Sequence, residues 1–113
     1  MSTINVRVTS NDKIKLASGY TFYYSGGFVS KGSVRKFLTL TEYRIINYFI
    51  NNSDQTTTPG ELIDHLSQYK DHCYSMQNIY GYIYNIRKKI ETNPRNPEAL
   101  LNVKPGYKLI ISY

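Results

Sequence analysis

The sequence contains few of the residues that disulfides, metal sites and covalent catalysis require. Cys73 is the single cysteine, so an intramolecular disulfide is excluded and a reducing compartment is expected. Its neighbours Asp71 and His72 do not complete a zinc site, which needs third and fourth ligands. No Asn or Asp at a recognisable spacing supports a nucleophilic cysteine. We therefore expect no metal, no cofactor and no enzymatic activity.

Long apolar segments are also absent from the sequence. No run approaches the ~20 residues of a membrane span, and the N-terminus, MSTINVRVTS, lacks the apolar core of a signal peptide. Hydrophobic residues make up 41% of the 113 residues and charged residues only 19%, a balance typical of folded proteins. We expect a single domain over residues 1–113.

The net charge of +6 is spread unevenly along the chain. Residues 1–38 carry six Lys or Arg against one acid, residues 39–73 two against five, and residues 74–113 six against two. The three segments therefore carry +5, −3 and +4. Two basic segments on either side of an acidic one suggest a bipolar molecule with a surface that faces a polyanion.

Short segments of alternating apolar and polar residues fill the first 38 residues. β-Branched and aromatic side chains are frequent in them, and Gly, Ser and Asn separate them, as expected for strands joined by turns. The segments are 4–8, 13–16, 20–24, 28–31 and 34–38. We predict a small antiparallel sheet with three or four effective strands over residues 4–38.

The hydrophobic period changes to that of helices after residue 38. Thr39 and Glu42 have the spacing of a capping box and predict a helix over about 40–51. Thr58 and Glu61 repeat that spacing around Pro59, which suits the first position of a second, short helix. Its apolar side would comprise Leu62, Ile63 and Leu66.

A third helix is predicted over residues 75–91, SMQNIYGYIYNIRKKIE. Four isoleucines recur at i, i+4, i+7 and i+11 and draw one narrow apolar stripe. Together with apolar residues of the first two helices they should form the buried centre of the domain. The predicted buried residues are Ile46, Phe49, Leu62, Leu66, Ile79, Ile83, Ile86 and Ile90.

The opposite face of this third helix carries amides, phenols and one glycine, and it runs into the basic cluster Arg87, Lys88 and Lys89. Amides can read base edges and cations can hold phosphates. Gly81, in the middle of this face, lets a partner approach the backbone, although it costs about 1 kcal/mol of helix stability relative to Ala. The helix taken alone also fits an ordinary solvated amphipathic helix.

The chain ends in a predicted hairpin. The turn-rich segment 93–97 stops the third helix, and strands at 100–103 and 107–111 flank Lys104, Pro105 and Gly106. Three helices closed by a C-terminal hairpin describe a winged helix-turn-helix. The predicted fold class is therefore α+β, with an N-terminal antiparallel sheet (1–38), a three-helix core (39–91) and a hairpin wing (100–113).

Four ordered motifs resemble those of the OmpR/PhoB-type effector domain. LTLTEY at 38–43 resembles the L-T-x-T-E-[FY] opening of that family's first helix, and PGEL at 59–62 resembles its capped second helix. The segment 78–90, NIYGYIYNIRKKI, resembles its recognition helix, T-V-D-V-H-I-R-R-L-R-K-K-L. NVKPGYKL at 102–109 is similar to its wing motif, T-V-R-G-x-G-Y-R-L. The resemblance extends over essentially the whole chain.

Departures from the family pattern fall on the recognition helix and the wing. Tyr84 and Asn85 stand where the family has paired arginines, and Tyr80 stands where it has an acidic residue. The wing is one residue shorter, with Pro105 and Gly106 in place of G-x-G. These differences leave the fold expectation intact and leave base preference and affinity open.

The resemblance implies double-stranded DNA as partner, with RNA polymerase or a second copy on an adjacent half-site as further partners. With no phospho-acceptor domain before the sheet, the arrangement resembles ToxR-type regulators, whose N-terminal DNA-binding domain precedes a membrane anchor. A free-standing regulator is equally compatible. The implied location is the cytoplasm, either of a free protein or of the cytoplasmic domain of an inner-membrane protein.

The leading functional hypothesis is sequence-specific DNA binding for transcriptional regulation, with the third helix in the major groove and the wing near the minor groove. Simple solvation is the alternative for Arg87 and Lys89. A winged helix that binds proteins instead is the second hypothesis, because tyrosines are enriched at protein interfaces. The predicted DNA-binding residues are Gln77, Asn78, Gly81, Tyr84, Asn85, Arg87, Lys88, Lys89 and Lys104.

Overall fold

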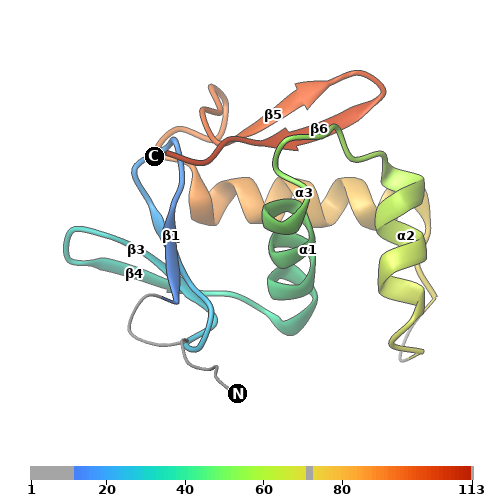
Figure 1. The fold of residues 1–113 in the computed structure, drawn as a ribbon, viewed down its shortest axis with the longest axis horizontal. Helices are drawn as coiled ribbons and strands as arrows, with labels where there is room; N and C mark the ends of the chain where they lie inside the picture. The colour runs from blue at the N-terminus through green and yellow to red at the C-terminus, as the bar shows by residue number, and fades with distance from the viewer. Residues whose placement is uncertain (1–11, 71–72, 113) are drawn as a thin grey trace, which may run out of the picture.

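A four-stranded antiparallel sheet opens the computed structural model, which describes residues 12–70 and 73–112. The strands β1 (Lys13–Lys15), β2 (Thr21–Tyr23), β3 (Phe28–Lys31) and β4 (Val34–Phe37) lie in sequence order (Figure 1). The predicted antiparallel sheet is thus confirmed. The predicted strand at 4–8 lies outside the described residues.

Three helices follow the sheet, as the sequence predicts. They are α1 (Leu40–Asn51), α2 (Pro59–Ser67) and α3 (Met76–Ile90). Helix α3 is the longest, and α1 crosses it (Figure 1). Helix α2 lies near the N-terminal end of α3, and the sheet lies near its C-terminal end. Helix α3 therefore has a neighbour at each end and a packed side along its length.

Each helix begins with a capping box. The Thr39 hydroxyl accepts a hydrogen bond from the Glu42 amide at 3.2 Å, and the Glu42 carboxylate accepts one from the Thr39 amide at 2.8 Å. Thr58 and Glu61 repeat the pair at 3.1 and 2.8 Å. Both boxes are confirmed predictions. A third, between Ser75 and Asn78 at the start of α3, was not predicted.

The core lies between the sheet, the helices and the wing. All eight residues predicted to form the buried centre are buried, so the predicted phase of the helices is confirmed. The sheet adds Phe22 and Val29 to this core, the residue after β1 adds Leu16, and the wing adds Leu100 and Leu109. Such burial stabilises the fold by about 25 cal/mol per Å² of apolar surface removed from water.

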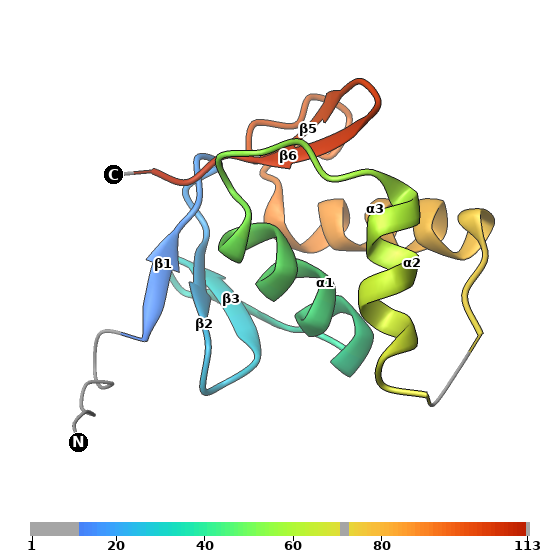
Figure 2. The ribbon, with the colours of Figure 1, turned by 45° about the vertical axis from the view of Figure 1, so that its right-hand side comes forward.

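The wing consists of β5 (Leu100–Val103) and β6 (Gly106–Leu109), which pair antiparallel (Figure 2). Thr57, in the connection between α1 and α2, and Tyr107 in β6 exchange two backbone hydrogen bonds of 2.8 Å. A Cβ atom at Gly106 would lie 2.0 Å from the Thr57 carbonyl oxygen. Glycine at this position therefore allows the wing to lie directly against the three-helix core.

Candidate nucleic-acid interface

The buried isoleucine stripe of α3 fixes which of its side chains face solvent. Ile79, Ile83, Ile86 and Ile90 are at most 2% exposed. Six predicted contact residues lie on the exposed remainder of the helix surface: Gln77, Asn78, Gly81, Tyr84, Asn85 and Lys88. Their exposure makes them available to a partner.

Two amides on this surface differ in what they can offer a partner. The Asn78 side-chain oxygen accepts a hydrogen bond from the Ser75 amide at 3.0 Å, as part of the capping box. No intramolecular hydrogen bond engages the Asn85 carboxamide in the part of the chain that the structure describes. Asn85 therefore keeps both its donor and its acceptor for a base edge, whereas Asn78 also has a structural role.

Two of the predicted DNA-binding cations are engaged inside the protein. The Arg87 guanidinium donates to the Leu100 carbonyl from Nε at 3.1 Å and from Nη2 at 2.7 Å, and Nη2 also donates to Asn102 Oδ1 at 2.9 Å. Lys89 Nζ donates to the Phe37 carbonyl at 2.9 Å and forms an ion pair with the Glu42 carboxylate at 2.7 Å.

These bonds show that Arg87 and Lys89 are not simply solvated. Their binding of phosphates stays a prediction. Arg87 fixes the wing to α3, and Lys89 compensates the buried carboxylate of Glu42, whose side chain is 5% exposed. A buried carboxylate needs such a partner, because burying an unpaired charge is costly. Lys89 is therefore a structural residue in this fold. Lys88 and Lys104, by contrast, are exposed.

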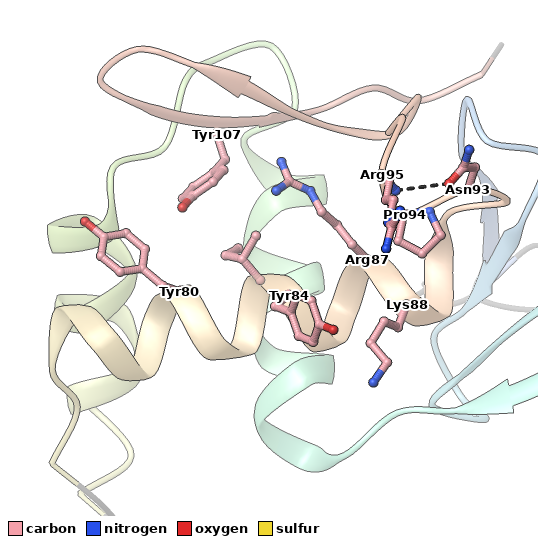
Figure 3. Close-up of a pocket in the computed structure, with 9 residues that line it drawn as sticks. Tyr80, Tyr84, Arg87, Lys88, Asn93, Pro94, Arg95 and Tyr107 are labelled. Carbon is pink, nitrogen blue, oxygen red and sulfur yellow. Dashed lines mark hydrogen bonds between the residues drawn. The ribbon is translucent and has the colours of Figure 1, made fainter.

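A cleft of about 400 Å³ lies beside the exposed face of α3. Its walls come from α3, from the turn after this helix and from the wing strand β6 (Figure 3). The residues that line it are Tyr80, Ile83, Tyr84, Arg87, Lys88, Asn93, Pro94, Arg95 and Tyr107. Three of them, Arg87, Lys88 and Arg95, are cations and none is acidic, so the lining carries a net positive charge.

A second cleft of about 210 Å³ lies toward the tip of the wing and shares Tyr80 and Tyr107 with the first. Its lining includes Asn102 and Lys104. We call the two adjoining clefts together the wing groove. Arg87, Lys88, Arg95 and Lys104, four of the six cations in residues 74–113, line it. The basic charge of this segment is thus gathered along one surface.

Tyr107 stands in the wall between the two clefts. Burial raises the pKa of its phenol, an effect that the nearby Arg87 guanidinium partly offsets. The Arg87 guanidinium lies 5.6 Å from the centre of the Tyr107 ring. The phenol therefore stays protonated at neutral pH and can donate a hydrogen bond to an anion in the groove.

Among the residues of the wing groove that the sequence did not predict are Arg95 and Tyr107. Arg95 belongs to a segment, 93–97, that was interpreted only as a turn that stops α3. One signal in the sequence could have indicated its role. Arg95 is a further cation shortly after the basic cluster that ends α3. Tyr107 was assigned to a wing strand, and the alternation of that strand does not indicate whether its ring faces α3.

The other candidate groups provide no second site. His65 is half-buried beside Tyr48, with ring centres 4.5 Å apart, and burial lowers its pKa. Cys73 is exposed and free. Among residues 12–70 and 73–112, no group of His, Cys, Asp and Glu could hold a metal ion, and no helix is long and apolar enough to span a membrane.

Comparison with known proteins identifies the family. The model of the family "Transcriptional regulatory protein, C terminal" matches residues 35–109. The chain belongs to this family. It is therefore a winged-helix DNA-binding domain of transcription regulation, of the OmpR/PhoB type that the motifs resemble, and this family is not one of enzymes.

Relatives and solved structures agree with this assignment. The sensory transduction protein RegX3 of Mycobacterium tuberculosis is 34% identical over 73 residues, which are 64% of this chain and 32% of RegX3. The chain thus spans about a third of the length of this relative. The DNA-binding domain of Escherichia coli CadC shares the fold, with a TM-score of 0.72 and 19% identity over 88% of this chain and 94% of that domain.

The response regulator AdeR offers a further comparison. Its DNA-binding domain, solved in complex with an intercistronic region, has a TM-score of 0.63 and is 28% identical. The match covers 85% of this chain and 98% of that domain.

Proposed function

We propose that this chain binds double-stranded DNA in a sequence-specific manner, with α3 in the major groove and the wing near the flanking minor groove. The observation that carries the proposal is the wing groove, where four cations adjoin the exposed phenols Tyr80 and Tyr84 of α3. Phosphate contacts position a protein on the duplex and base-edge contacts specify the sequence. The DNA-binding domain of AdeR, solved in complex with an intercistronic region, supports DNA binding by this chain.

We assign separate roles to the exposed residues of this surface. Gln77, Tyr84 and Asn85 face bases, where amides suit adenine and a tyrosine ring can contact a thymine methyl. Lys88 and Lys104 hold phosphates, the second from the tip of the wing. RNA polymerase, or a second copy of the domain on an adjacent half-site, would bind surfaces outside the wing groove. The protein-interaction alternative is not favoured, because the family is one of transcriptional regulators.

Replacing Lys104 or Lys88 with alanine is expected to weaken binding to all duplexes alike. Each lysine that neutralises a phosphate releases counterions, so its loss should reduce the slope of log K against log salt by about 1. The measurement is a fluorescence-anisotropy titration at several salt concentrations. Its probes are a 30-base-pair duplex recovered by selection from a random library and a random duplex of equal length.

Lys15→Ala is the charge-matched control, because Lys15 is exposed on β1, at the edge of the sheet opposite β4. Lys15→Ala should leave the affinity for both duplexes and the slope of log K against log salt unchanged. Equal effects of Lys15→Ala and Lys104→Ala would show that general charge, and not the groove, governs binding. Wild-type protein that binds neither duplex at low salt would refute the proposed function itself.

Gly81→Ala is expected to affect stability and DNA binding in opposite directions. A Cβ atom at Gly81 would meet nothing within 4 Å apart from its chain neighbours and the backbone of its own helix. Alanine should therefore stabilise the free protein by about 1 kcal/mol through its higher helix propensity. If the backbone of α3 approaches the duplex here, the added methyl group should weaken binding. Thermal unfolding and anisotropy measure the two effects, and unchanged affinity would argue against close approach at Gly81.

A further inference from the structure

The turn after α3 places Arg95 on the same surface as the recognition helix. Arg95 lines the larger cleft of the wing groove from one side, and Lys88 and Tyr84 line it from the other (Figure 3). We infer that this cleft is a phosphodiester site, in which Arg95 and Lys88 hold one backbone phosphate of the DNA strand that passes between α3 and the wing. The inference rests on the proposed function and adds to it a contact residue and its ligand.

The turn is held firmly enough to position Arg95. The Glu91 carboxylate, on a residue that is 2% exposed, accepts hydrogen bonds from the amides of Glu98, Ala99 and Leu100 at 2.7–3.1 Å. At the other end of the turn, Asn93 Oδ1 accepts the Arg95 amide at 3.1 Å. The backbone at Arg95 is thus fixed before DNA binds, which lowers the entropy cost of forming a contact there.

The Asn93 carbonyl adds a further bond to the turn by accepting the Asn96 amide at 2.9 Å. Outside the turn, Thr92 Oγ1 donates to the Ser18 carbonyl at 3.2 Å. The segment between Glu91 and Leu100 is therefore hydrogen-bonded both within itself and to the connection between β1 and β2. The Arg95 side chain remains exposed above these bonds.

The chemistry of the cleft suits a phosphate with its sugar. Lys88, Arg95 and the fixed guanidinium of Arg87 supply positive charge, and guanidinium groups match the geometry of phosphate oxygens. The phenols of Tyr84 and Tyr107 are further donors. Pro94, which is exposed, adds apolar surface against which a deoxyribose ring can pack. No base is needed to fill the site, so it positions the domain and does not select a sequence.

The test pairs Arg95→Ala with neutral phosphates in the DNA. The probes are copies of the selected 30-base-pair duplex. Each copy carries one uncharged methylphosphonate, at a different backbone position. For wild-type protein, neutralising the phosphate in the cleft should weaken binding about tenfold at 0.1 M salt. Arg95→Ala should weaken binding to the unmodified duplex and reduce the salt slope by up to about 1. It should lose less affinity than the wild type on that one methylphosphonate, because only Lys88 still contacts the phosphate.

Two variants serve as controls for Arg95→Ala. Arg95→Lys should keep most of the affinity for the duplex and a salt slope close to that of the wild type, because the positive charge is kept. For Lys15→Ala, each methylphosphonate that weakens binding of the wild type should weaken binding to the same extent. If Arg95→Ala leaves affinity and salt slope unchanged while wild-type protein binds the duplex, the phosphodiester site is refuted and the proposed function stands.

The cleft could also bind the phosphate group of a small molecule in place of a DNA phosphate. Inorganic pyrophosphate, added to protein without DNA and compared with chloride at equal ionic strength, should cause no saturable rise in melting temperature. A saturable rise that is lost in Arg95→Ala would assign the cleft to a free ligand and overturn the DNA contact. Absence of duplex binding by the wild type would refute the proposed function and this inference together.

Discussion

Replacing Glu91 with alanine is expected to lower the free energy of unfolding by about 3 kcal/mol. The substitution removes the acceptor for three backbone amides, those of Glu98, Ala99 and Leu100, of which the last two belong to buried residues. Each buried donor left without a partner costs about 1–3 kcal/mol. Relief from burying the carboxylate offsets only part of this cost, because the carboxylate is well hydrogen-bonded in the native protein.

Urea unfolding followed by circular dichroism measures this effect. Glu91→Gln should lie between the wild type and Glu91→Ala, because the amide keeps one oxygen acceptor but turns an NH₂ group toward the backbone donors. Glu98→Ala is the matched control: Glu98 is exposed, so its loss should change stability by no more than about 0.5 kcal/mol. A loss below about 1 kcal/mol for Glu91→Ala would contradict the role given to this carboxylate.

The fold could be predicted largely because its signals are local. The capping spacings at Thr39 and Thr58 mark two helix starts, and the isoleucine stripe sets the phase of α3. The spacing of apolar residues shows which side of each helix is buried. The buried residues could therefore be predicted from that spacing. The start of α3 was missed as a capping box because Asn78, not Glu or Gln, stands at the third helical position.

The candidate interface could be predicted only in part, since long-range contacts decide which cations remain free. Arg87, Lys88 and Lys89 form one basic run in the sequence, yet their surroundings in the structure differ. Lys89 pairs with Glu42, which is 47 positions away, and Arg87 binds the wing at Leu100. No local pattern in the sequence indicates which of the three meets a buried carboxylate or a strand carbonyl.

Helical spacing also has limits at the ends of elements. Leu40 follows the apolar spacing of α1 but is 60% exposed, because it lies at the first position of the helix, beyond the reach of the core. Glu91 shows the opposite effect, since an acid at the end of a basic helix resembles an ordinary surface residue. Its burial depends on the return of the chain at Ala99 and Leu100.

Asn85→Ala is expected to cost about 1–3 kcal/mol of binding free energy on the selected duplex and little on random DNA. Asn85 is uncharged and exposed, and its carboxamide has no intramolecular hydrogen bond in the described part of the chain. Its removal should therefore leave both the fold and the salt slope unchanged. The corresponding change at Asn78 should also lower stability, because that side chain caps α3.

The most direct test of the claim that α3 reads base edges is the anisotropy titration of wild type and Asn85→Ala on the selected and the random duplex. Asn51→Ala, which removes an exposed amide at the end of α1, is the matched control and should bind as the wild type does. We predict a loss of about 5- to 150-fold on the selected duplex alone, with an unchanged salt slope. Equal weakening on both duplexes, or no weakening on either, would contradict the placement of this face of α3 against the bases.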